Sequence, residues 1–236
     1  RHTDKPIMSW PVATIGENEK VFKMIEMVMG EGYLSSHYFV TASVCALSPL
    51  QYAQESADTI IAYARANQPV TVLTAPMTGV STPISDIGAL VAQNAELLAG
   101  IVLAQLVQPG VPVIYGTATY AADMRSGAFI TGSPLSNLID RAALQLAQSL
   151  YHMPTRTLAG NTDAKVPDIQ AGYETMQNYI QLLMGGTHMI NECLGILDGM
   201  MTVSYEKYII DEEMLRRVGC MMRGLDTSEA SFDMGV

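Results

Sequence analysis

Short apolar runs alternate with longer segments of helical periodicity along the whole chain. The short runs are nearly continuous in their apolar character, which is typical of strands in a sheet that is covered on both faces. We predict six such strands, at residues 5–13, 38–47, 69–77, 111–120, 153–160 and 186–194.

The longer segments show helical spacing and carry helix start and stop signals. Ser48 with Pro49, and Ser133 with Pro134, match an N-cap followed by proline at the first helical position. Ser85 opens a further segment, and the pair Gly185 and Gly186 suits a helix C-terminus. The predicted helices cover residues 17–32, 48–68, 85–110, 133–152, 166–186 and 202–224.

This alternation predicts an α/β fold with a parallel sheet built from about six βα units. A TIM (β/α)8-type barrel has eight strands and typically about 250 residues, so the chain fits a barrel that is incomplete. An open doubly wound sheet is the alternative, although no GxGxxG follows the first strand. No linker or low-complexity tract interrupts the sequence, so we predict one partial barrel domain over residues 1–236.

Charge and composition narrow the classes of partner. The formal net charge of -10 and pI of about 4.7 argue against a nucleic-acid surface and suit a cationic ligand. The most apolar helix, residues 85–110, contains Gln93, Asn94 and Glu96, which indicates a buried helix rather than a membrane span. The 3 cysteines lie far apart, which favours free thiols in a reducing cytoplasm.

Candidate site residues follow from the rule that α/β proteins place their sites where strands end. Aromatic faces with carboxylates would suit a quaternary ammonium ion, which is held without hydrogen bonds. No metal-binding cluster is apparent among the 4 histidines and the acids. Plain structural roles stay open: helix capping for Asp163, a surface pair for Asp123 with Arg125, and a core position for His188.

Four separated segments together resemble the trimethylamine methyltransferase family, the MttB-like superfamily. They are "LVAQNAELLAGIVLAQLVQPGVPVIYG", "AADMRSGAFITGSP", "NTDAKVPDIQAGYE" and "SYEKYIIDEEMLRRV". The resemblance implies a TIM barrel that moves a methyl group from a methylated amine to the cob(I)alamin of a partner corrinoid protein. Every residue is a standard one, so the chain resembles the pyrrolysine-free branch, whose substrates are quaternary amines such as betaines. Members of this family are longer, so we expect a fragment.

The resemblance turns the loop residues into specific expectations. We expect His188 to face the barrel lumen as the catalytic residue, near the corrinoid or the substrate. Aromatic cage residues would be Tyr115, Tyr120 and Trp10, and a betaine carboxylate would need Arg125 or a helix N-terminus. The expected substrate-binding residues are Tyr115, Tyr120, Asp123, Arg125, Asn161, Asp163 and Glu192.

Three alternatives stay open at this point. One is a barrel that binds a betaine without turning it over, and another is an enzyme specific for trimethylamine. The third is an aldolase-like barrel, for which only Lys165 is placed to form a Schiff base, and Asp163 would keep that lysine protonated. We further expect a cytoplasmic homo-oligomer that binds neither nucleic acid nor membrane and holds no metal of its own.

Overall fold

A computed structural model describes residues 5–9 and 13–232 of the chain. All six predicted strands are present and form one parallel sheet in the order β1-β2-β3-β5-β8-β9. Their bounds are β1 Ile7–Ser9, β2 Val40–Cys45, β3 Val70–Thr74, β5 Val113–Thr117, β8 Thr155–Leu158 and β9 Met189–Asn191.

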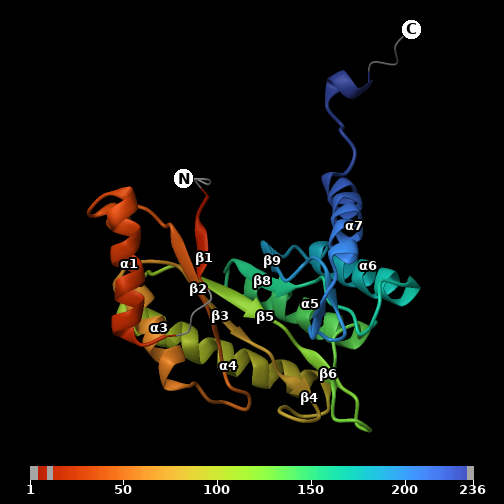
Figure 1. Ribbon diagram of the computed structural model, residues 1–236, viewed down its shortest axis with the longest axis horizontal. Coiled ribbons are helices and arrows are strands. Elements are labelled where there is room, and N and C mark those ends of the chain that lie inside the picture. Colours follow the sequence, from red (N-terminus) through yellow and green to blue (C-terminus); the bar gives the residue numbers. More distant parts are fainter. Residues whose placement is uncertain (1–4, 10–12, 233–236) are drawn as a thin grey trace.

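The sheet is curled, and its helices follow the outer side (Figure 1). The strands are arranged in their order along the chain, and the Asn191 amide on β9 reaches the Met8 sulfur on β1, at 2.9 Å across the inner side. A doubly wound sheet reverses its strand order and carries helices on both faces, so this alternative is wrong. The fold is therefore a six-stranded parallel half-barrel with a concave inner face.

Seven α-helices are described. Five of the six predicted helical segments each contain one of them, α1 begins two residues before its predicted segment, and the short helix α2 was not predicted. The bounds are α1 Ile15–Met29, α2 Tyr33–Ser36, α3 Gln54–Arg65, α4 Asp86–Val107, α5 Pro134–Ser149, α6 Ile169–Leu183 and α7 Tyr205–Arg223, with a 3-10 turn η1 at Glu229–Phe232. The side chains of Ser85, Ser133 and Asp168 each accept a backbone N–H at a helix start, as expected of N-caps.

The predicted start of the second long helix at Ser48 is wrong. Helix α3 begins at Gln54, and the preceding residues are drawn into a tertiary contact with α4. Glu96 on α4 accepts the Ser48 hydroxyl at 2.7 Å and the Leu50 N–H at 2.9 Å. Glu96 thus accepts the Leu50 N–H, which the Ser48 side chain would have capped in a helix that started there.

Short strands that the sequence did not reveal lie beyond the carboxyl ends of the main strands. β4 Met77–Thr78, β6 Tyr120–Ala122 and β7 Phe129–Ile130 form a small sheet, and β10 Ile196–Leu197 pairs with β11 Thr202–Val203. They shape the mouth of the half-barrel, where parallel α/β folds place their sites.

Helix α4 is, among the described residues, the one helix long and apolar enough to cross a membrane by length and composition. Its inner side packs on the convex face of the sheet, where Gly100 permits close approach to Val72. Its polar residues Gln93 and Glu96 are buried and bond to hydroxyls at the ends of β5 and β3. These contacts are those of a core helix.

Candidate active site on the concave face

The strand register determines which side chains face the inside of the half-barrel. Gly116, Arg156 and Met189 are neighbours on adjacent strands, so they share one face of the sheet. Met189 and Met8 line the same apolar pocket on the concave side, and Asn191 reaches Met8 across it. Arg156 therefore lies on the concave face.

Arg156 was not among the residues expected at the site. It is the largest fully buried side chain among the described residues, with 1% of its surface exposed. Its Nε donates to Asn191 Oδ1 at 3.1 Å. Its terminal atoms Nη1 and Nη2 are buried and have no hydrogen-bond partner in the described part of the chain. Burial lowers the pKa of Arg156, and the charge of Glu192 opposes that shift.

Glu192 follows β9 and supplies the opposite charge. Its Oε1 lies 3.9 Å from Arg156 Nη2, which is an ion pair but too long for a hydrogen bond. The residue adopts a left-handed backbone conformation with φ of 50°. Burial raises the pKa of Glu192, while the neighbouring guanidinium lowers it. Glu192 thus lies beside Arg156, and its expected role in substrate binding stays a prediction.

Tyr120 brings an aromatic face to the same place. It is buried on β6, its ring centroid lies 5.3 Å from that of Phe129 on β7, and its hydroxyl faces the Met200 sulfur. Tyr120 packs in one cluster with Leu158, which shares the concave face of β8 with Arg156. Burial raises the pKa of Tyr120, and the charge of Glu192 adds to that shift. Tyr120, Glu192 and Arg156 thus converge from three separate elements.

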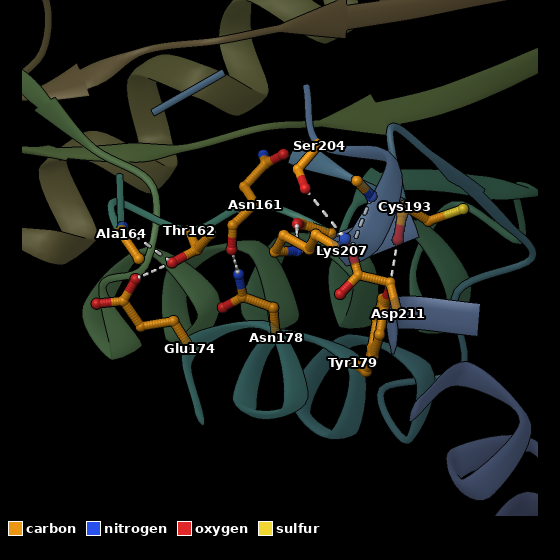
Figure 2. A network of polar contacts seen from close by, with 12 residues as sticks. Asn161, Thr162, Ala164, Glu174, Asn178, Tyr179, Cys193, Ser204, Lys207 and Asp211 are labelled. Carbon is orange, nitrogen blue, oxygen red and sulfur yellow. Dashed lines mark hydrogen bonds and ion pairs between the residues drawn. The ribbon is translucent and has the colours of Figure 1, made fainter. Parts of the chain in front are cut away.

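Asn161 lies just after β8 and is buried. Its backbone carbonyl accepts from the Asn178 amide at 2.8 Å, and Figure 2 shows its side chain directed away from α6. The Oδ1 atom is buried and has no hydrogen-bond partner among the described residues. A buried acceptor without a partner is uncommon, so this amide is a second polar group available to a ligand.

A buried ion pair holds the loops that carry these residues (Figure 2). Lys207 on α7 donates to Asp211 at 2.6 Å and to the Gly160 carbonyl at 3.2 Å. Asp211 also accepts the Gly195 N–H at 2.7 Å. The pair therefore fastens α7 to the loop after β8 and to the loop after β9.

Other expected residues have structural contacts. Asp163 accepts the backbone N–H groups of Thr131 and Gly132, at 2.9 and 3.0 Å, and so braces the loop before α5. Asp123 accepts the Arg125 N–H at 2.9 Å within the turn between β6 and β7. Arg125 is exposed, and we do not assign it to the concave site.

Two expected placements are wrong. Tyr115 lies on the convex face of β5, where its hydroxyl donates to Asn94 on α4 at 3.0 Å, so it belongs to the core between sheet and helices. His188 precedes β9, at the amino end of the sheet, where its ring contacts the Thr155 hydroxyl at 2.9 Å. Alternation separated His188 and Ile190 from Asn191 correctly but did not tell which face is concave. It fails for Glu192, which follows β9 in a left-handed conformation and pairs with Arg156. Trp10 lies outside the described residues.

The Schiff-base alternative also loses its support. Lys165 is exposed at the surface and pairs with Asp198, not with its sequence neighbour Asp163. No three His, Cys, Asp or Glu side chains within residues 5–9 and 13–232 converge as metal ligands. The three cysteines are free, and Cys45 is half-buried at the end of β2.

Comparison with known proteins places this chain in a family. The family model described as trimethylamine methyltransferase (MTTB) matches residues 1–236. A proline betaine:corrinoid methyltransferase of Eubacterium limosum is 41% identical over 187 residues, which are 79% of this chain and 38% of that protein. A glycine betaine methyltransferase of Desulfitobacterium hafniense is 38% identical over 207 residues, which are 87% of this chain and 43% of that protein.

A trimethylamine methyltransferase of Methanosarcina barkeri is also similar, at 41% identity over 187 residues, covering 79% of this chain and 37% of that protein. The chain thus spans less than half the length of each of these three relatives. The four segments singled out in the sequence lie within the stretch that the family model matches. This chain belongs to the trimethylamine methyltransferase family.

Proposed function

We propose that the protein containing this chain moves a methyl group from a quaternary ammonium compound to the cob(I)alamin of a partner corrinoid protein in the cytoplasm. Family membership supports the methyltransferase activity, and the relatives named for proline betaine and glycine betaine support the substrate class. The chain spans less than half the length of these relatives, so we propose the activity for the complete protein.

The grouping of Tyr120 with the Arg156–Glu192 ion pair on the concave face is the observation that carries this proposal. A quaternary ammonium ion has no N–H group, so a protein binds it through aromatic faces and nearby negative charge. Tyr120, backed by Phe129, offers the aromatic face, and Glu192 offers the carboxylate. Both lie at the carboxyl-end mouth, where a second protein has access to a bound ligand.

The reaction asks little of the protein beyond binding and orientation. The partner's cob(I)alamin is a co-substrate that supplies the nucleophile. The carbon–nitrogen bond breaks, its electron pair stays on nitrogen, and the amine leaves neutral without needing a proton. Tyr120 and Glu192 would hold the ammonium group, exclude water and direct one methyl carbon toward the mouth.

We further propose that the half-barrel is part of a TIM barrel and that residues 1–236 form a single unit within it. Six parallel strands in chain order with helices outside support this, because a (β/α)8 barrel extends the same arrangement by two strands. The relatives are more than twice as long as this chain, which leaves enough sequence for two further βα units. The homo-oligomer expected from the sequence stays a prediction.

A trimethylamine enzyme is the second candidate, supported by the relative from Methanosarcina barkeri. The two candidates differ in the nitrogen, since a tertiary amine carries a lone pair and must be activated before it can leave. A barrel that only binds betaine would hold the ligand without any methyl transfer.

One assay separates these possibilities. The full-length protein is mixed with cob(I)alamin and, in turn, glycine betaine, proline betaine, choline, tetramethylammonium or trimethylamine, and methylcobalamin is followed by absorbance. We expect product with at least one quaternary amine and none with trimethylamine. Product with trimethylamine alone would replace the proposal with the second candidate, and binding without any product would leave a binding protein.

A further inference from the structure

The guanidinium of Arg156 is a buried cation whose bonding capacity is mostly unused. It has five N–H donors, and the one on Nε is taken by Asn191. The Nη atoms carry the other four, and neither has a hydrogen-bond partner in the part of the chain that the structure describes. Glu192, at 3.9 Å, gives charge compensation without a hydrogen bond. Buried groups in native proteins are seldom left in this state.

Residues of β9 and β1 hold the Arg156 guanidinium in position. Asn191 Oδ1 accepts the hydrogen bond from Arg156 Nε, and the Asn191 amide nitrogen contacts the Met8 sulfur at 2.9 Å. The guanidinium plane is thereby oriented by groups from β9 and β1, and its two terminal nitrogens are left for another partner. Because a planar guanidinium presents two parallel N–H groups, the ligand that suits it best is a carboxylate bound through both oxygens.

We propose that Arg156 is the carboxylate-recognition residue of this site and that the substrate is a zwitterion: a quaternary ammonium compound that also carries a carboxylate. This proposal rests on the proposed function and specifies its substrate class. It replaces the earlier expectation for Arg125, whose side chain is exposed on the β6–β7 turn.

Charge complementarity supports the zwitterion over the other amines. Arg156 and Glu192 present opposite charges 3.9 Å apart. Tyr120 packs in one cluster with Leu158, which shares the concave face of β8 with Arg156. In glycine betaine one methylene carbon separates the ammonium nitrogen from the carboxylate. Bound head to tail, its carboxylate meets Arg156 and its trimethylammonium group meets Glu192 and Tyr120. Choline and trimethylamine carry no anionic group, so they would leave the Arg156 donors buried and unsatisfied, which is unfavourable.

The test compares ligands that differ in the carboxylate alone. Glycine betaine and choline share the trimethylammonium group, and their binding to the full-length protein is measured by calorimetry. In Arg156→Gln we expect glycine betaine to bind about 10- to 100-fold more weakly, since a hydrogen-bonded charge is lost. The affinity for choline should change less than about twofold, because choline makes no bond to Arg156. Arg125→Gln is the matched control, and it should leave both affinities unchanged.

Arg156→Lys covers the case in which Arg156→Gln fails to fold. It keeps the positive charge but cannot form the two parallel bonds, so glycine betaine should still weaken more than choline. Equal changes for the two ligands, or none, in whichever variant folds would overturn the assignment. Methyl transfer is measured in parallel with the wild-type protein: its absence with every amine would reject the proposed reaction, while the binding comparison would still decide the role of Arg156.

Discussion

The ammonium group of Lys207 lies 2.6 Å from the Asp211 carboxylate, one helical turn apart on α7, and at most 1% of either side chain is exposed. Each partner also bonds to a loop at the mouth: Lys207 to the Gly160 carbonyl and Asp211 to the Gly195 N–H. Asn161 is the residue after Gly160 in the sequence. The ion pair thus connects the stability of α7 to the geometry of the candidate site.

Replacing Lys207 with Met should be strongly destabilising, because it leaves the Asp211 charge buried and uncompensated. We expect a loss of about 3–5 kcal/mol in the free energy of unfolding, measured by denaturant titration of the full-length protein. Arg217→Met is the matched control: its ion pair with Glu213 has the same spacing but is exposed, so the loss should stay below about 1 kcal/mol. Equal losses in the two variants would contradict the role given to the buried pair.

Gly160→Ala should damage the site through its backbone. A Cβ atom at this position would overlap the Cys193 backbone in the neighbouring loop, which cannot yield without moving Glu192. We expect about 1–3 kcal/mol of destabilisation and a fall in kcat/KM for glycine betaine. At Gly172 on α6 an added Cβ meets nothing within 4 Å, so Gly172→Ala should keep full activity. If Gly160→Ala keeps wild-type kinetics, the contact between these two loops does not determine the geometry of the site.

Substitutions at Tyr120 test the aromatic contact. Phe keeps the ring and loses the hydroxyl, whose one hydrogen bond to a described residue is with the Met200 sulfur, so Tyr120→Phe should bind choline nearly as wild type does. Tyr120→Leu removes the ring face, and its affinity should fall by about 2- to 30-fold, corresponding to roughly 0.5–2 kcal/mol of cation–π attraction. Calorimetry with choline measures both, and equal affinities for the Phe and Leu variants would exclude the ring as a ligand contact.

The pH dependence of choline binding tests Glu192. The ammonium ion is attracted by the ionised carboxylate, so affinity is lost as the pH falls and Glu192 takes up a proton. Because burial raises the pKa of Glu192, this loss should begin at a higher pH than for an exposed glutamate. Choline carries no carboxylate, so a change in affinity at acidic pH reports on the titration of the protein. Glu192→Gln should bind about tenfold more weakly near neutral pH and show a flat profile, and a variant with an unchanged profile would assign the titration to another group.

The strands and most helix starts could be predicted because their signals are local. A buried parallel strand is apolar on both faces, and Ser85, Ser133 and Asp168 cap helices within a few residues of themselves. The start of α3 could not be found in this way. The residues around Ser48 bond to Glu96, which is distant in the sequence, and this tertiary contact overrides the serine–proline signal.

The site itself was only partly predictable. Tyr120 and Glu192 could be nominated because they lie where strands end, and their role in binding stays a prediction. Tyr115 and His188 were misplaced because alternation does not tell which face is concave. Arg156 was missed although a signal exists: it is a charged residue inside the short apolar run 153–160, and charged residues are almost never fully buried without a partner. Its unfilled Nη donors become visible only once the fold is known.

The most direct test of the central claim is a crystal structure of the full-length protein with glycine betaine bound. The account predicts that the two carboxylate oxygens lie within hydrogen-bond distance of Arg156 Nη1 and Nη2, with the trimethylammonium group between Tyr120 and Glu192. The contradicting result is a structure in which both Nη atoms are hydrogen-bonded to other parts of the polypeptide and the ligand lies elsewhere.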